Sequence, residues 1–169
     1  MHHRVGITTS YLEPGDEIHR RLDSAGFAVS YARPQDREAS GQSLAEALAG
    51  VHGVIAGNDA FDAGVIGAVP DLRIIARTGV GYDNVDVEAA SRHGVIVCTT
   101  PGANQQSVAE LTLALMMCCA RGIIPAATEV QAGGWTQRTG LELAGATLGV
   151  LGLGSIGKEV ALLAKALGM

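Results

Sequence analysis

Short apolar runs alternate with helical patterns through the first hundred residues of the chain. Runs of four or five apolar residues between turn residues are typical of buried strands, and helical spacing marks the segments between them. The pattern predicts strands at 5–8, 27–31, 53–56, 73–76 and 95–98, and helices at 16–24, 43–49, 62–68 and 86–93. This alternation predicts an α/β protein built on a parallel sheet with crossover helices.

Turn residues mark the ends of several of these elements. Asp62 is a predicted helix N-cap, and Gly26 and Gly50 are predicted helix stops. Five such units make a small flavodoxin-like parallel-sheet domain, which we expect at residues 1–100. The turn-forming segment 99–104 is the predicted crossing into a second domain, residues 101–169.

The second part of the chain has mainly helical patterns instead of alternating strands and helices. Ser107 and Glu110 form an S-x-x-E pattern that predicts a capping box at a helix start. The helix that follows, through Ala120, is apolar almost all round and is expected to be buried between layers or against another subunit. A second helix is predicted at 124–131, and a strand at 147–151 leads through a glycine turn into a helix at 158–167.

That glycine turn has the G-x-G-x-x-G spacing of a dinucleotide-binding unit. Gly152 permits the tight turn, Gly154 lets the backbone approach a pyrophosphate, and Gly157 lets the helix pack closely on the strand. The helix start then offers the amides of Ser155 and Ile156 to the phosphates. The turn therefore predicts a cofactor site, and the alternative is a glycine-rich turn without a ligand.

A second glycine-containing loop follows the fourth predicted strand, in the sequence ARTGVGYDNVD. Gly79 and Gly81 would allow successive amides to form an anion-binding nest for a small carboxylate. The alternative is a plain strand–helix turn capped by Asp83 or Asp86. Arg77, at the head of the loop, is either a substrate ligand or the structural partner of a nearby carboxylate.

The remaining polar candidates carry weaker signals. Asn104, ahead of a helix start, could orient a carbonyl oxygen or could be an ordinary turn residue. His19, His52 and His93 lie on polar faces or turns, and we expect them at the surface. No metal-ligand spacing is present, so no metal site is predicted.

Composition narrows the function classes. The 169 residues are 47% hydrophobic and 17% charged, with a net charge of −5, which indicates a globular core and disfavours nucleic-acid or anionic-membrane binding. The three cysteines, Cys98, Cys118 and Cys119, suggest reduced thiols and a cytoplasmic protein. The most apolar helical stretch, 111–120, is too short to span a bilayer, and no leader is predicted at the start.

Four stretches occur in order and together resemble one family: LRIIARTGVGYDNVD, GVIVCTTPGANQQSVAELTLALMMCCAR, GGW and LGVLGLGSIGKEVA. They resemble the D-isomer-specific 2-hydroxyacid dehydrogenases, most closely the phosphoglycerate dehydrogenase and hydroxypyruvate reductase branch. The resemblance is strong from Leu72 to Met169 and mainly architectural before that. It implies a flavodoxin-like substrate domain followed by the start of a Rossmann NAD-binding domain, with the active site in the cleft between the two domains.

The resemblance also implies roles for particular residues. Val80 and Gly81 would offer amides to the substrate carboxylate, with Val80 also near the cofactor, and Asn104 would lie near the nicotinamide. The residues implied for the pyrophosphate are Gly152, Gly154, Ser155, Ile156 and Gly157. The helix from Ser107 and the segment around Trp135 would belong to the contact of a homodimer.

The implied reaction is hydride transfer between NAD(H) and C2 of a small 2-hydroxy or 2-oxo acid, such as 3-phosphoglycerate, hydroxypyruvate or glyoxylate. The family's catalytic arginine, glutamate and histidine lie in the later half of its Rossmann domain. We expect all three beyond Met169, so the chain is expected to be an inactive N-terminal fragment without catalytic residues. The acidic residue that would bind the ribose hydroxyls is also expected beyond Met169. The choice between NAD and NADP as the cofactor is therefore open.

One departure from the family pattern bears on the substrate. Members specific for phosphoglycerate often carry an Arg-Ser pair after the third strand, where this chain has Ala56-Gly57-Asn58. Two other interpretations stay open: a non-enzymatic, corepressor-like module that senses dinucleotide, and a self-sufficient flavodoxin-like binding domain with a helical arm.

Overall fold

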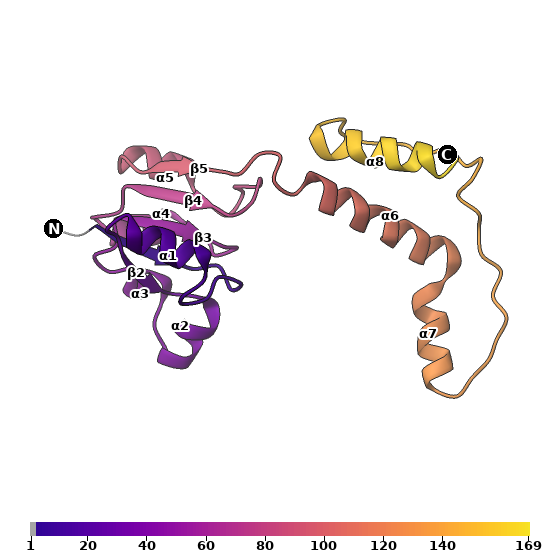
Figure 1. Ribbon diagram of the computed structural model, residues 1–169, viewed down its shortest axis with the longest axis horizontal. Coiled ribbons are helices and arrows are strands. Elements are labelled where there is room, and N and C mark those ends of the chain that lie inside the picture. The colour runs from indigo at the N-terminus through magenta and orange to yellow at the C-terminus, as the bar shows by residue number, and fades with distance from the viewer. Residues whose placement is uncertain (1–2) are drawn as a thin grey trace. The chain divides into compact units, whose positions relative to one another are not determined.

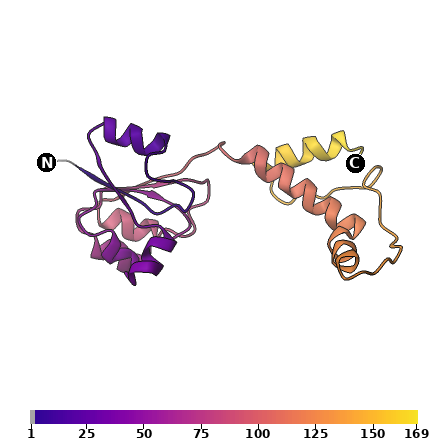
Figure 2. The ribbon, with the colours of Figure 1, turned by 60° about the horizontal axis from the view of Figure 1, so that its bottom comes forward.

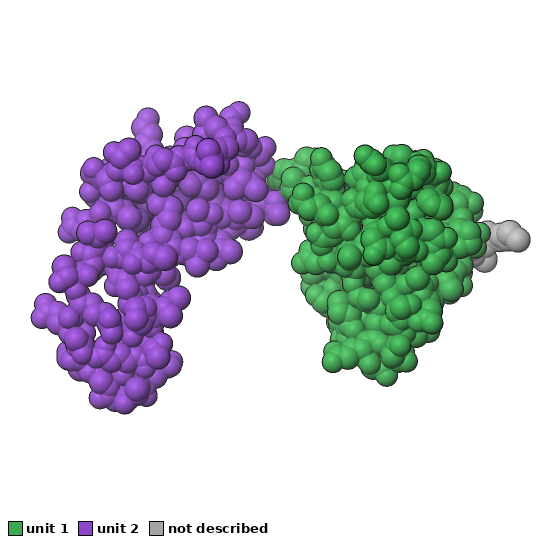
Figure 3. All heavy atoms as spheres, turned by 180° about the vertical axis from the view of Figure 1, so that it is seen from behind, with its two compact units in different colours: residues 1–103 green, residues 104–169 purple. Residues whose placement is uncertain are grey.

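The computed structural model describes residues 3–169 and resolves them into two compact units. The first unit runs to Ala103, and the second runs from Asn104 to Met169 (Figure 3). The first unit is a parallel sheet covered by helices, and the second consists of three helices and the extended segments that join them (Figure 1).

The first unit contains one five-stranded parallel sheet with the order β2-β1-β3-β4-β5. This order is the flavodoxin-like one, and it confirms the predicted α/β class. In the register, Val5 lies opposite Gly53, and Ala56 lies opposite Arg77. All five predicted strands are present: β1 Arg4–Ile7, β2 Ala28–Tyr31, β3 Gly53–Ala56, β4 Ile74–Arg77 and β5 Ile96–Cys98.

Helices cover both faces of this sheet (Figure 2). Helix α1 lies on one face, and α3, α4 and α5 lie on the other. Asp62 caps α4 as predicted, because its carboxylate accepts from the Val65 amide at 2.9 Å. The helices of this unit are α1 Glu17–Ser24, α2 Pro34–Ser40, α3 Leu44–Ala47, α4 Ala63–Ala68 and α5 Val87–Arg92.

The main core of the first unit lies between the sheet and helices α3, α4 and α5. Val54 and Ile75, on the central strands, pack there with Leu48, Phe61 and Ile66, and all five side chains are almost completely buried. Burying a large aliphatic or aromatic side chain stabilises a fold by about 1.5–3 kcal/mol. This core therefore fixes the central strands β3 and β4, whose carboxyl ends lead into the loops described below.

The second unit is held together by helix α6 (Gln105–Arg121) packed on helix α8 (Ser155–Ala166). Ala109 of α6 and Ala164 of α8 are almost fully buried at this contact, beside Leu113 and Val160. Helix α7 (Ile123–Gln131) follows α6 after a left-handed glycine. Within residues 3–169 no single helix is long and apolar enough to cross a membrane, and only the pair α6 and α7, bent by 65°, reaches that length and composition together.

Two local predictions for the second unit are wrong. Helix α6 begins at Gln105, so Ser107 lies inside its first turn and forms no capping box; Glu110 instead accepts from the Gln106 side chain at 2.8 Å. The segment 147–151 is not a strand. A strand is defined by a hydrogen-bonded neighbour, and this segment pairs with no other strand in the part of the chain that the structure describes.

The first unit leaves no room for a side chain at Gly57. A Cβ there would lie 2.9 Å from Thr9 Cα, and the Gly57 amide donates to Thr8 Oγ1 at 3.1 Å. We expect Gly57→Ala to lower the free energy of unfolding by about 1–3 kcal/mol, because backbone must shift to admit the methyl group. Urea unfolding followed by circular dichroism measures the change.

The matched control is Gly67→Ala in α4, where the new Cβ would meet only the His93 ring at 3.7 Å. That substitution should be neutral or stabilising by up to about 1 kcal/mol, because alanine favours a helix. Equal unfolding midpoints for the two variants would contradict the assigned packing at Gly57.

Candidate functional site

The carboxyl ends of β3 and β4 lie side by side at one edge of the parallel sheet. The loops that leave them are bonded to each other: the Thr78 amide donates to Ala56 O at 3.0 Å, and the Asn84 side chain donates to Asn58 O at 2.7 Å. Open α/β sheets bind their ligands at this edge. The loop predicted to hold a carboxylate is therefore attached firmly to the sheet.

The loop after β4 presents successive backbone donors without acceptors. The amides of Gly79, Val80 and Gly81 make no hydrogen bond to any described residue, whereas the Gly79 carbonyl accepts from the Thr100 amide at 3.0 Å. The predicted nest is not formed, because a nest alternates right- and left-handed residues and neither glycine has a positive φ. The loop nevertheless offers a row of free N–H groups that suits an anion.

Arg77 ends β4 directly beneath this loop. Its side chain is only 7% exposed, and its Nε donates to Gly81 O at 3.1 Å. Nη1 is buried without a partner, and none of the carboxylates in residues 3–169 forms an ion pair with this guanidinium. The carboxylate partner, one of the two interpretations of Arg77, is therefore absent from the described chain, and a backbone carbonyl takes its place.

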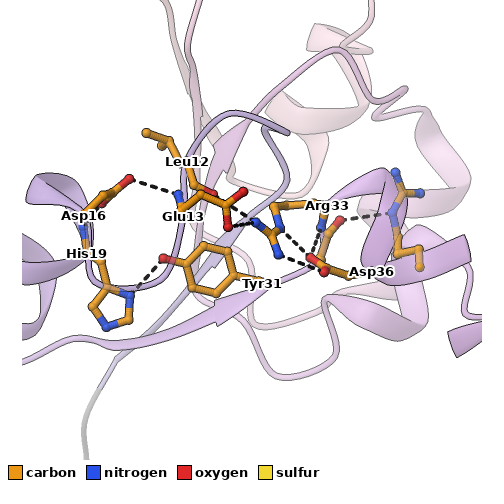
Figure 4. Close-up of polar contacts among 9 residues, drawn as sticks. Leu12, Glu13, Asp16, His19, Tyr31, Arg33 and Asp36 are labelled. Atoms are coloured by element: carbon orange, nitrogen blue, oxygen red, sulfur yellow. Dashed lines mark hydrogen bonds and ion pairs between the residues drawn. The ribbon is translucent and has the colours of Figure 1, made fainter. Parts of the chain in front are cut away.

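A second polar cluster lies near the ends of β1 and β2 (Figure 4). The Arg33 side chain donates to Asp36 at 2.7 Å, pairs with Glu13, and stacks over the Tyr31 ring. The hydroxyl of Tyr31 is bonded to His19 Nδ1 at 2.9 Å. The Arg33 guanidinium lowers the pKa of Asp36, and burial raises the pKa of Tyr31. These groups satisfy one another, so the cluster fixes the segment after β1.

The loop after β3 carries a negative group. Asp59 pairs with Arg37, whose Nε also donates to Ala32 O at 3.0 Å. The second carboxylate oxygen of Asp59 is buried without a partner. No sequence pattern indicates this pair, because its members lie 22 residues apart and meet only through the strand order.

The glycine turn of the second unit has the geometry that its motif requires. Gly152 has φ +93°, and a Cβ on Gly157 would lie 2.1 Å from Gly152 O, so helix and turn approach too closely for any side chain. No atom lies within 4 Å of a Cβ built on Gly154. Helix α8 begins at Ser155, and the amides of Ser155, Ile156 and Gly157 have no acceptor among residues 3–169.

The predicted site residues are divided between the two units. Val80 and Gly81 belong to the first unit, whereas Asn104 and the glycine turn belong to the second. Asn104 is the N-cap residue of α6, but its side chain makes no capping bond, and its Oδ1 is buried without a partner. Its side-chain amide is thus not committed to the helix.

The histidines lie away from the free amides of the β4 loop. His19 is bonded to Tyr31, His52 accepts from the Arg4 amide at 3.2 Å, and His93 follows the last residue of α5. No described histidine makes a hydrogen bond or ring contact with residues 79–81. No group of three or more potential metal ligands is found in the described chain.

Comparison with known proteins places these features in a family. The family model for the D-isomer specific 2-hydroxyacid dehydrogenase, catalytic domain, matches residues 9–160. D-3-phosphoglycerate dehydrogenase of Pongo abelii is 49% identical over 109 residues, which are 63% of this chain and 20% of that protein. Hydroxypyruvate reductase of Thermotoga maritima is 49% identical over 109 residues, 63% of this chain and 36% of that protein.

Solved structures of other proteins are similar to this chain over nearly its whole length. A protein of Thermus thermophilus matches with a TM-score of 0.82 and 35% identity, covering 98% of this chain and 54% of that one. NAD⁺-bound 3-phosphoglycerate dehydrogenase of Entamoeba histolytica matches with a TM-score of 0.78 and 30% identity, covering 100% of this chain and 52% of that one. The chain thus spans about half the length of these solved relatives.

Proposed function

Because the chain belongs to the family of D-isomer specific 2-hydroxyacid dehydrogenases, we propose that it binds the carboxylate of a small 2-hydroxy or 2-oxo acid through the amides of Val80 and Gly81. The observation that carries the proposal is the row of unpaired N–H groups above the buried, uncompensated charge of Arg77. Donors fixed in this way stabilise an anion without reorganising. The whole protein is then an oxidoreductase acting at C2 of that acid.

The residues of the glycine turn fit the pyrophosphate of a dinucleotide. Gly154 leaves open space for the close approach of a ligand to the backbone, and the free amides of Ser155, Ile156 and Gly157 supply donors at the positive end of α8. NAD(H), when bound, supplies or accepts the hydride. Asn104 would line the site near the nicotinamide. The alternative cofactor is NADP.

Local charge favours an unphosphorylated substrate such as hydroxypyruvate or glyoxylate over 3-phosphoglycerate. Position 57, directly after β3, has no room for a side chain, and the first charged residue of this loop is the acidic Asp59, so the loop itself offers no cation to a substrate phosphate. Arg37 is already engaged by Asp59. The three free cysteines support a reducing, cytoplasmic location.

The phosphate-binding role can be tested with inorganic pyrophosphate and the ¹⁵N-labelled chain. We expect the ligand to shift the amide resonances of Ser155, Ile156 and Gly157. Gly157→Ala should weaken binding by roughly tenfold or more, because the new Cβ would force the turn away from the helix start. Gly149→Ala, where the added Cβ meets no atom within 4 Å, is the control. Equal binding by both variants would refute the role.

The isolated chain is expected to bind ligands without turning them over. None of the described histidines makes a hydrogen bond to the loop after β4, and histidine is the residue that most often carries a proton to or from a substrate oxygen. Incubation of the chain with NADH and hydroxypyruvate should therefore leave the NADH absorbance unchanged over hours. Steady oxidation of NADH that scales with the concentration of the chain would contradict this expectation.

We further propose that the protein forms a homodimer through α6, α7 and the segment around Trp135. Trp135 is 88% exposed, and Leu115 and Ile124 are also largely exposed on these elements. Trp135→Ser should raise the dimer dissociation constant by roughly tenfold or more, measured by light scattering after size exclusion. Tyr11→Ser, at a 65% exposed aromatic of the first unit, should leave it unchanged. A monomeric wild-type chain would overturn the proposal.

A further inference from the structure

At the end of β4, the Arg77 side chain points to the face of the sheet that α3, α4 and α5 cover. Its strand partner in the register is Ala56, which belongs to the buried core between the sheet and helices α3, α4 and α5. The guanidinium is 7% exposed and reaches the overlying loop only through its bond from Nε to Gly81 O, at 3.1 Å. It thus connects the rigid sheet to the loop.

This arrangement is a poor one for stability. A buried charge is normally paired, and a buried N–H without an acceptor carries the cost of its lost hydration. Arg77 has one bond to a carbonyl, an unpartnered Nη1, and no carboxylate partner among the described residues. An apolar side chain of similar volume would fill the same space without that cost. The one bond that Arg77 does make holds the loop, through Gly81 O.

Two carbonyl oxygens of the loop are held by the protein. The Gly79 carbonyl accepts from the Thr100 amide at 3.0 Å, and the Gly81 carbonyl accepts from Arg77. Because a trans peptide is planar, fixing its oxygen points its N–H group the opposite way. The N–H groups of these two peptides belong to Val80 and Tyr82, and neither donates to any described residue.

We propose that Arg77 is a positioning residue: it holds the Gly81–Tyr82 peptide so that the Tyr82 N–H joins those of Val80 and Gly81 as a donor to the substrate carboxylate. Gly81 and Tyr82 are exposed, so a peptide whose oxygen is held from the buried side turns its N–H toward solvent. The bond from a cation also polarises this peptide and strengthens its N–H as a donor. The inference rests on the proposed function, since it concerns the same carboxylate.

The test uses the ¹⁵N-labelled chain titrated with oxamate, an unreactive analogue of a small 2-oxo acid. Arg77→Lys keeps the charge but loses the planar Nε–H donor, and Arg77→Gln keeps an N–H donor without the charge. Arg73→Met removes an exposed arginine from the position just before β4 and is the matched control. The melting temperature of each variant shows that it is folded.

In the wild type, oxamate should shift the amides of Val80, Gly81 and Tyr82. Arg77→Lys should lower the affinity for oxamate by roughly tenfold. Without ligand, it should also lower the backbone order parameters of Gly81 and Tyr82. Arg73→Met should change neither the affinity nor the order parameters. A merely structural residue would lower the melting temperature and leave the affinity of the folded fraction intact.

Several outcomes would overturn the inference. Wild-type affinity in Arg77→Lys, a Tyr82 amide that oxamate does not move, or failure of both Arg77 variants to fold would each do so. The proposed function fails separately if oxamate moves none of the loop amides in the wild type. In that case, unchanged order parameters in Arg77→Lys would also refute the claim that Arg77 holds the Gly81–Tyr82 peptide in place. Lowered order parameters would support that claim for the loop without a ligand.

Discussion

The parallel pairing of β3 with β4 is the constraint on which the rest of the first unit depends. It brings Ala56 opposite Arg77, so the two strands end at the same level and the loops that follow them can bond through Thr78 and Asn84. Gly57 must be a glycine because the backbone that follows β1 lies against it at the same edge. Buried side chains on both strands hold this edge rigid, and rigidity is what a row of amide donors needs in order to select an anion.

The fold of the first unit could be predicted because its strands are short apolar runs separated by clear turn residues. Helix α2 was missed because its sequence, PQDREAS, contains no apolar stripe at helical spacing, although Pro34 at its first position is a usual start signal. The strand predicted at 147–151 did not form, since its apolar pattern can be satisfied only by a neighbour that the described chain does not supply. Sequence patterns reveal which residues suit a strand but not whether a partner strand is present.

The site shows the same division between local and non-local information. The close packing of the glycine turn could be predicted from the sequence because it depends on neighbouring residues: a Cβ on Gly157 would lie 2.1 Å from Gly152 O. The partner of Arg77 could not be predicted in the same way. Sequence reasoning left Arg77 as either a substrate ligand or the partner of a carboxylate, whereas the loop folds back to offer the carbonyl of Gly81. The Arg37–Asp59 pair could not be predicted either, because its members lie 22 residues apart in the sequence.

The free amides after β4 are proposed to hold the carboxylate of a small 2-oxo or 2-hydroxy acid, and the other assignments in the first unit follow from that contact. A crystal structure of the chain grown with tartronate, a small 2-hydroxy acid, tests it most directly. We predict a carboxylate of the ligand within hydrogen-bonding distance of the Val80 and Gly81 amide nitrogens, with the Arg77 bond to Gly81 retained. A ligand bound elsewhere, or one that draws Arg77 away from Gly81, would contradict it.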